Sequence, residues 1–165
     1  MAKFCLKCYE IFKIESMLSD KVNSFQHCPK YSCTGQVIEV DELMLPTIIE
    51  LNKKGYYTKY CCSGHYYDRS PNGYIYFDKG ITIPSLPLGY KYDENNSESN
   101  TIRNDFSQYI DEEDTNYESD KYFEIINYNV SALLDWAKSL PNCINHTINW
   151  KYDAIIKIER GKYEK

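Results

Sequence analysis

Apolar and polar residues follow two different periods in the first half of the chain. Residues 43–51 repeat apolar side chains at helical spacing, whereas the flanking segments alternate or are rich in β-branched and aromatic residues. Asp41 stands where a helix N-cap is expected, Gly55 follows the last apolar turn, and Pro46 is compatible with an early helical turn. These patterns predict four elements: a strand at 37–40, a helix at 43–51, and strands at 56–62 and 73–77.

A polar, acidic stretch divides the second half of the chain. Residues 93–120 contain ten acids and one base, Arg103, so this stretch carries a net charge of −9 and the remainder carries +4. We expect residues 92–120 to form a flexible loop with one short helical turn near 102–110. Beyond this loop the pattern predicts a strand at 122–126, a helix at 132–140 capped by Asn129 or Ser131, and a closing strand at 148–158.

These elements define an expected α+β architecture. Residues 37–165 should form a domain with a mixed, mainly antiparallel sheet, two helices on one face and an acidic flexible insertion at 92–120. Residues 1–36 should form a separate zinc-ribbon-like module at the N-terminus. No internal repeat is present in the sequence.

Composition and charge limit the kinds of partner. The chain has 165 residues with 42% hydrophobic and 15% aromatic content, which is typical of a globular protein. Its 17 tyrosines can lie half-buried or can stack on bases or sugars. A net charge of −5 disfavours binding along extended duplex nucleic acid. The first residues carry no secretory pattern and no apolar run approaches membrane-spanning length, so we expect a cytoplasmic protein.

Four of the seven cysteines form two close pairs near the start of the chain. They are Cys5 and Cys8 in a CxxC pair, and Cys28 and Cys33 in a CxxxxC pair. Two short turns that each aim two sulfurs at one point suit tetrahedral zinc, and four thiolates would close the shell of a structural ion. The alternatives are four unpaired buried thiols or two disulfides, which a reducing compartment disfavours. The neighbouring His27 could substitute as a ligand.

The second predicted strand ends in the sequence Cys-Cys-Ser-Gly-His, which could carry chemistry. Because strand residues alternate, Cys61 and Cys62 should point to opposite faces of the sheet. Ser63 and Gly64 offer a hydroxyl and backbone N–H groups to an anion or a nucleotide. Cys62 and His65 could instead form a nucleophile and its base. A tight turn with a solvent-facing His65 is the third interpretation.

An apolar helix ending in Leu-Asn is followed by a strand with Thr placed four residues before a Cys-Ser-Gly turn. This arrangement, over residues 41–78, resembles the core of the wybutosine-synthesising methyltransferase family, which acts on wyosine-type tRNA bases. The matching residues are Thr58, Cys62, Ser63 and Gly64. His65 stands where the family has Arg. The resemblance implies an RNA-modifying enzyme that binds S-adenosylmethionine.

The layout of the whole chain resembles a second group of proteins. A cysteine ribbon, the run from Val37 to Leu43, the Cys-Ser-Gly-His turn and a Tyr-Ile-Tyr-Phe strand occur in this order. The same layout is found in uncharacterised zinc-ribbon-containing proteins of bacteriophages and mobile elements. This resemblance implies a protein of the bacterial cytoplasm and carries no activity with it.

Three functions are compatible with these observations. The first is a non-catalytic binding protein for a small nucleotide-like ligand, in a phage setting an anti-defence protein that sequesters a host defence signal. Its ligand-binding residues would be Thr58, Cys62, Ser63, Gly64, His65, Tyr66 and Tyr76. The alternatives are an RNA-modifying enzyme resembling the wyosine-type tRNA methyltransferases, and a zinc-ribbon adaptor that binds another protein through the acidic loop. The sequence leaves open whether the chain forms a homo-oligomer.

Overall fold

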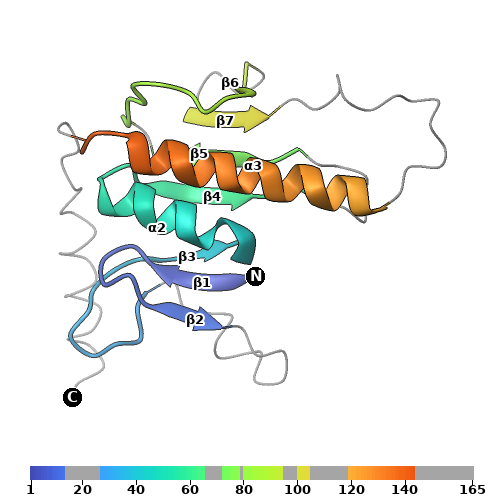
Figure 1. Ribbon diagram of the computed structural model, residues 1–165. Coiled ribbons are helices and arrows are strands. Elements are labelled where there is room, and N and C mark those ends of the chain that lie inside the picture. The colour runs from blue at the N-terminus through green and yellow to red at the C-terminus, as the bar shows by residue number, and fades with distance from the viewer. Residues whose placement is uncertain (14–26, 66–71, 79, 95–99, 105–118, 144–165) are drawn as a thin grey trace. The chain divides into compact units, whose positions relative to one another are not determined.

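The computed structural model describes residues 1–13, 27–65, 72–78, 80–94, 100–104 and 119–143. The chain forms two compact units, the first containing Met1–Glu39 and the second Val40–Ile144. The described residues form an α+β architecture with two sheets and two α-helices (Figure 1).

A small three-stranded sheet organises the first unit. Its strands are β1 (Ala2–Cys5), β2 (Ile11–Lys13) and β3 (Val37–Val40), in the order β2-β1-β3. β1 and β2 are antiparallel, with Lys3 opposite Phe12. All four residues of β1 are buried, and Phe4 is fully enclosed. The predicted strand at 37–40 is therefore present, but it pairs in this small sheet and not with the strands that follow.

The first helix of the second unit forms where the sequence predicts it. Asp41 caps the 3-10 turn η1 (Glu42–Met44), because its carboxylate accepts a hydrogen bond of 3.1 Å from the Leu43 backbone N–H. α2 (Leu45–Lys53) follows directly, with Pro46 in its first turn, where the missing N–H costs nothing. Ile48 and Leu51 are fully buried on one side of this helix.

The second unit contains a four-stranded antiparallel sheet. Its strands are β4 (Thr58–Cys62), β5 (Tyr74–Phe77), β6 (Tyr90–Tyr92) and β7 (Asn100–Asn104), in the order β4-β5-β7-β6. β4 and β5 match the predicted strands at 56–62 and 73–77. The predicted loop at 92–120 is wrong for 100–104, and the helical turn predicted from 102 is wrong for 102–104. Pairing with β5 imposes the strand, because it buries Ile102 directly opposite Ile75.

The long helix α3 (Ser119–Ser139) corrects a second prediction. The segment 122–126 is helical and not a strand, although its local sequence favours a strand. Tyr122, Ile126 and Leu133 are buried and lie at helical spacing, so burial of one continuous face overrides local β-propensity. The helix predicted at 132–140 is the C-terminal part of α3. Neither Asn129 nor Ser131 is a cap, because the helix begins ten residues earlier.

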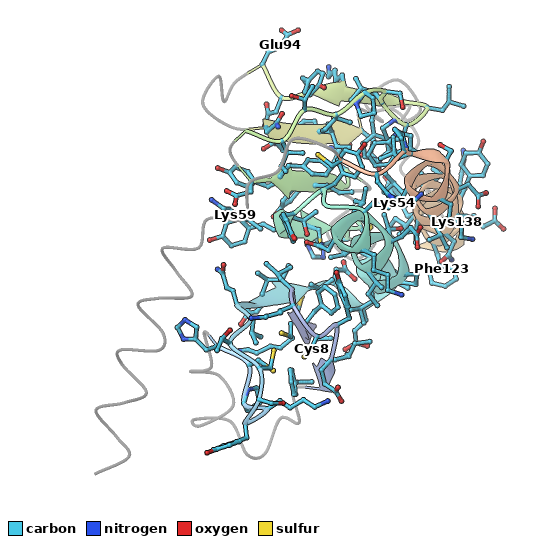
Figure 2. All side chains as sticks on the ribbon, turned by 90° about the vertical axis from the view of Figure 1, so that its left-hand side faces the viewer. Cys8, Lys54, Lys59, Glu94, Phe123 and Lys138 are labelled. Carbon is cyan, nitrogen blue, oxygen red and sulfur yellow. The ribbon has the colours of Figure 1, made fainter. Side chains whose placement is uncertain are left out.

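α2 and α3 pack on each other and cover one face of the four-stranded sheet (Figure 1). Lys54, just after α2, joins the two helices: its Nζ donates to the backbone carbonyls of Ala137, Lys138 and Leu140 at the end of α3, at 2.9, 2.5 and 2.8 Å. Figure 2 shows Lys54 and Lys138 side by side on the helical side of the sheet. This ammonium satisfies carbonyls that the helix end leaves unpaired.

The opposite face of the sheet carries no helix among the described residues. The closing strand predicted at 148–158 lies outside the described residues. Of the helices described, none is both long and apolar enough to cross a membrane.

Candidate metal centre and candidate ligand face

The four cysteines of the first unit converge on one point. The sulfurs of Cys5, Cys8, Cys28 and Cys33 all lie within 4.8 Å of one another. Cys5 Sγ is 3.7 Å from Cys33 Sγ, and Cys8 Sγ is 3.6 Å from Cys28 Sγ. A tetrahedral site with metal–sulfur bonds of about 2.3 Å places its sulfurs roughly 3.8 Å apart. The cluster could therefore hold a metal ion, as the paired spacing in the sequence predicts.

Backbone N–H groups orient the sulfurs. Lys7 N and Cys8 N each lie 3.5 Å from Cys5 Sγ and donate to it, and Gly35 N donates to Cys33 Sγ over 3.4 Å. The first turn is closed by Tyr9, whose φ of 60° bends the chain back into β2. Such N–H groups would disperse the negative charge of thiolate ligands, so the turns are compatible with metal-bound sulfur.

Gly35 provides the space that the sulfurs need. A Cβ at this position would lie 2.5 Å from Cys5 Sγ and 2.5 Å from Lys7 Cβ, both far inside contact distance. The chain therefore passes directly against the cysteine cluster only because this residue has no side chain.

Burial disfavours free thiolates at two of the four cysteines. Burial raises the pKa of Cys5 to about 12 and also raises the pKa of Cys28, whereas hydrogen bonds lower the pKa of the less buried Cys8. A bound divalent cation would compensate the cost of the buried negative charge, since metal binding to cysteines displaces their protons. His27 pairs with Gln36 in an isolated β-bridge and is not part of the four-sulfur cluster.

The Ser-Gly-His turn after β4 is held by Asp41. Asp41 Oδ2 accepts hydrogen bonds from Ser63 N at 3.1 Å and from Ser63 Oγ at 2.6 Å. Gly64, with a φ of 100°, directs its N–H to Cys62 Sγ at 3.4 Å. The hydroxyl and the two backbone N–H groups that an anion would need are thus engaged within the chain, which sequence alone did not predict.

Cys61 and Cys62 have different surroundings, as the alternation of the strand predicts. Cys61 is buried, and burial raises its pKa to about 12. Cys62 is half-buried, and its Sγ lies 3.3 Å from Nε2 of the exposed His65. The pair predicted from sequence is therefore in contact. However, burial also raises the pKa of Cys62, which opposes formation of a nucleophilic thiolate.

Thr58 lies apart from the turn, inside the core of the second unit. It is 1% exposed; its hydroxyl accepts a 3.0 Å hydrogen bond from Asn52 Nδ2, and its N–H donates to Asn52 Oδ1 at 3.3 Å. Asn52 Nδ2 also donates to the Ile48 carbonyl at 2.8 Å. These two residues join α2 to β4. Of the other predicted ligand residues, Tyr76 lies on β5, and Tyr66 lies outside the described residues.

The sheet face opposite the helices brings together aromatic and cationic residues. Directly opposed residues share a face, which gives two cross-strand rows. One row is Cys62, Tyr74, Arg103 and Lys91; the other is Tyr60, Tyr76 and Thr101. The rings of Tyr60 and Tyr76 lie 5.9 Å apart in an edge-to-face arrangement, and Tyr60 is 64% exposed. We call these two rows the open face.

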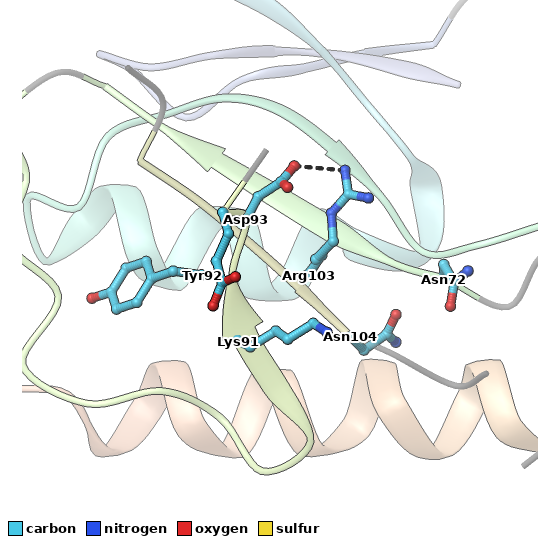
Figure 3. Close-up of a pocket in the computed structure, with 7 residues that line it drawn as sticks. Asn72, Lys91, Tyr92, Asp93, Arg103 and Asn104 are labelled. Atoms are coloured by element: carbon cyan, nitrogen blue, oxygen red, sulfur yellow. Dashed lines mark ion pairs between the residues drawn. The ribbon is translucent and has the colours of Figure 1, made fainter. Parts of the chain in front are cut away.

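A pocket of about 270 Å³ lies at the β6 and β7 end of the open face (Figure 3). Arg103 lines it and forms an ion pair of 2.8 Å with Asp93. The other lining residues are Asn72, Lys91, Tyr92, Glu94 and Asn104. Sequence reasoning missed Arg103 because β7 was assigned to a loop, and it missed Lys91 because no strand was predicted at β6. The alternating Tyr-Lys-Tyr and Asn-Thr-Ile-Arg-Asn segments were the available signal.

No protein family, curated protein or solved structure matches this chain. The interpretation of both sites therefore rests on their chemistry.

Proposed function

We propose that this protein is a zinc-stabilised, non-catalytic binding protein for a small nucleotide-like ligand, which lies on the open face beside the Cys62–His65 turn. The observation that carries the proposal is the placement of Tyr60, Tyr76 and Arg103 on one face of the sheet, the face on which the described residues form no helix. Exposed tyrosines are stacking surfaces for bases, and a neighbouring guanidinium suits a phosphate.

Zinc is the metal that four cysteines in two close pairs suit best. All four ligand positions are filled by sulfur, so a bound ion would have no open position for a substrate. Its role is to stabilise the first unit, in which Cys5, Cys28, Cys33 and Val37 form a small apolar cluster.

The charges near the open face favour a small ligand over a long polyanion. Lys59 pairs with Asp78 at 2.9 Å, and Arg103 pairs with Asp93 at 2.8 Å. Binding along a nucleic acid strand depends on many uncompensated cations that replace counterions. A ligand with one or a few phosphates needs only one such contact, and its base can supply the remaining affinity by stacking.

Binding without conversion is supported by the state of the turn. Ser63 is 3% exposed, so a substrate cannot easily reach its hydroxyl, and burial raises the pKa of Cys62, which disfavours its nucleophilic thiolate. Thr58, one of the residues that match the tRNA-modifying enzymes, is buried, and its hydrogen bond to Asn52 joins two elements of the fold. Holding a signalling nucleotide away from its receptor, as an anti-defence protein would, requires binding alone.

The test is isothermal titration calorimetry and thermal shift against a panel of nucleotides, with S-adenosylmethionine included. For the nucleotide that binds, we expect Tyr76→Ala to weaken binding by about tenfold or more, since stacking on one aromatic ring contributes about 1–3 kcal/mol. Tyr128→Ala is the control, because Tyr128 is an exposed tyrosine that lies on α3 and not on the open face. It should leave binding unchanged.

The variant His65→Ala tests whether the Cys62–His65 turn takes part in binding or whether the sheet face alone binds the ligand. A loss of binding in this variant places the ligand within reach of the Cys62–His65 contact. If no nucleotide in the panel binds, the proposed function is wrong. Binding of S-adenosylmethionine with turnover would instead favour the RNA-modifying enzyme.

A further inference from the structure

We propose that the pocket at Arg103 is the phosphate subsite of this ligand and that Asp93 occupies it in the free protein. This inference rests on the proposed function and assigns the ligand to the class of nucleotides with a terminal phosphate. The Asp93 carboxylate is then a competitor that the phosphate displaces from the guanidinium.

The sheet register places Arg103 at a suitable distance from the tyrosines. Arg103 lies directly opposite Tyr74 and diagonally across from Tyr76. Diagonal neighbours on one sheet face have side-chain origins about 7–8 Å apart. This separation is comparable with that between a base and the phosphate of the same nucleotide. A base stacked on Tyr76 therefore brings its phosphate to the pocket.

Lys91 places a second cation at the same point. It lies directly opposite Arg103 in the pairing of β6 with β7, and both residues line the pocket. An arginine fork binds two phosphate oxygens together, and a lysine adds a point charge. Asn72, on the far side of the pocket from Tyr92 in Figure 3, adds a side-chain amide to the lining.

The present partner of Arg103 is itself an anion. Asp93 Oδ2 lies 2.8 Å from Arg103 Nη2, and the Asp93 side chain is only 9% exposed, whereas that of Arg103 is 46% exposed. The Asp93 backbone N–H donates to the Thr101 carbonyl at 2.9 Å, which fixes its position beside β7. A carboxylate held in this way engages the guanidinium that a phosphate would bind. Arg103 remains exposed enough for a ligand to reach it.

Charge balance explains why the site would bind one phosphate and no extended polyanion. Among the described lining residues, two cations, Lys91 and Arg103, face two anions, Asp93 and Glu94, so these side chains together carry no net charge. A phosphate that replaces one carboxylate at Arg103 keeps a favourable contact. Additional phosphates would meet the remaining carboxylates and be repelled.

The experiment compares a nucleoside, its 5′-monophosphate and inorganic phosphate by calorimetry at fixed ionic strength. The base is the one selected by the nucleotide panel. Asp93→Asn should bind the monophosphate about three- to tenfold more tightly, because the competing charge is removed. Arg103→Gln should bind it about tenfold or more weakly. Neither change should alter nucleoside binding.

The matched control is Asp78→Asn, which removes the carboxylate from the other ion pair beside β4 and β5, outside the pocket. It should leave all three affinities unchanged. Equal affinity for nucleoside and monophosphate would overturn the subsite while leaving the proposed function intact. If Asp93→Asn does not bind the monophosphate more tightly, Asp93 does not compete with the phosphate for Arg103. This result is decisive even if Arg103→Gln is too unstable to measure. Absence of any nucleoside or nucleotide binding would remove both proposals.

Discussion

The turns that carry Cys33 and Cys62 have the same local construction and different surroundings. Cys33-Thr34-Gly35 and Cys62-Ser63-Gly64 both direct the glycine N–H to the cysteine sulfur at 3.4 Å. Around Cys33, three further sulfurs arrive from two segments. Around Cys62, one imidazole lies in contact and Asp41 holds the serine. A local motif thus positions a sulfur, whereas convergence of distant segments decides whether a metal site forms.

The strongest test of this comparison replaces one sulfur in each turn. Cys33→Ser should lose the bound metal, with a fall in affinity of more than about 100-fold, because metal binding and folding of such small units are coupled. Native mass spectrometry should report one ion per chain in the parent protein and none in this variant. Hydrogen exchange should show loss of protection in β1 and β3.

Cys62→Ser is the matched variant in the second turn. It should keep one ion per chain and the protection of β1, because Cys62 is not part of the four-sulfur cluster. Metal loss in both variants would mean that the second turn also contributes to metal binding. Retention of metal in both would exclude Cys33 as a ligand.

The convergence of the four cysteines could be predicted from sequence, whereas most of the open face could not. Two close cysteine pairs indicate such a cluster whatever the fold between them, because four sulfurs at one point are what a tetrahedral ion would need. Arg103 reaches the open face only through the pairing of β7 with β5, in a segment whose polar composition indicates a loop. Tertiary contacts here decide secondary structure, and composition does not report them.

The two helices also differ in how well local sequence predicts them. α2 carries its own signals, namely the Asp41 cap and an apolar stripe, and was predicted within a few residues. The start of α3 was predicted as a strand because four of its residues favour strands locally. The helical spacing from Tyr122 through Ile126 to Leu133 was present in the sequence, but it is visible only over a longer window.

A second, smaller effect should follow from removing the hold of Asp41 on the Ser-Gly turn. Asp41→Asn keeps an oxygen for the Leu43 N–H but replaces the Oδ2 acceptor of Ser63 by a donor. Leaving buried donors unpaired should lower the free energy of unfolding of the second unit by about 1–3 kcal/mol. Urea denaturation measures this loss, and metal content should stay at the parent value.

Ser63→Ala is the comparison for this variant. It removes only the hydroxyl and leaves the Ser63 N–H bonded to Asp41, so its cost should be smaller, about 1 kcal/mol. If Asp41→Asn and Ser63→Ala lower the free energy of unfolding equally, the hydrogen bond from the Ser63 backbone N–H to Asp41 contributes nothing to stability.

The smallest effect concerns Cys61, the core-facing neighbour of Cys62, and appears only at alkaline pH. Burial raises the pKa of Cys61 from 9.0 to about 12, so the folded state keeps the thiol neutral while the unfolded state ionises. The contribution of the neutral Cys61 thiol to the free energy of unfolding is fully present below pH 9. This contribution is lost as the pH rises from 9 towards 12. At pH 10 the loss should be roughly 1 kcal/mol.

Trp136 fluorescence in a Trp150→Phe background reports unfolding of the second unit, because Trp136 is buried on α3. Between pH 8 and 10 the free energy of unfolding should fall by roughly 1 kcal/mol less in Cys61→Ala than in the parent protein. Cys62→Ser should change this decline less, since Cys62 is only half-buried. An unchanged slope in Cys61→Ala would show that the thiol is hydrated in the folded state. Cys61 and Cys62 would then point to opposite faces of the sheet but have equally hydrated sulfurs.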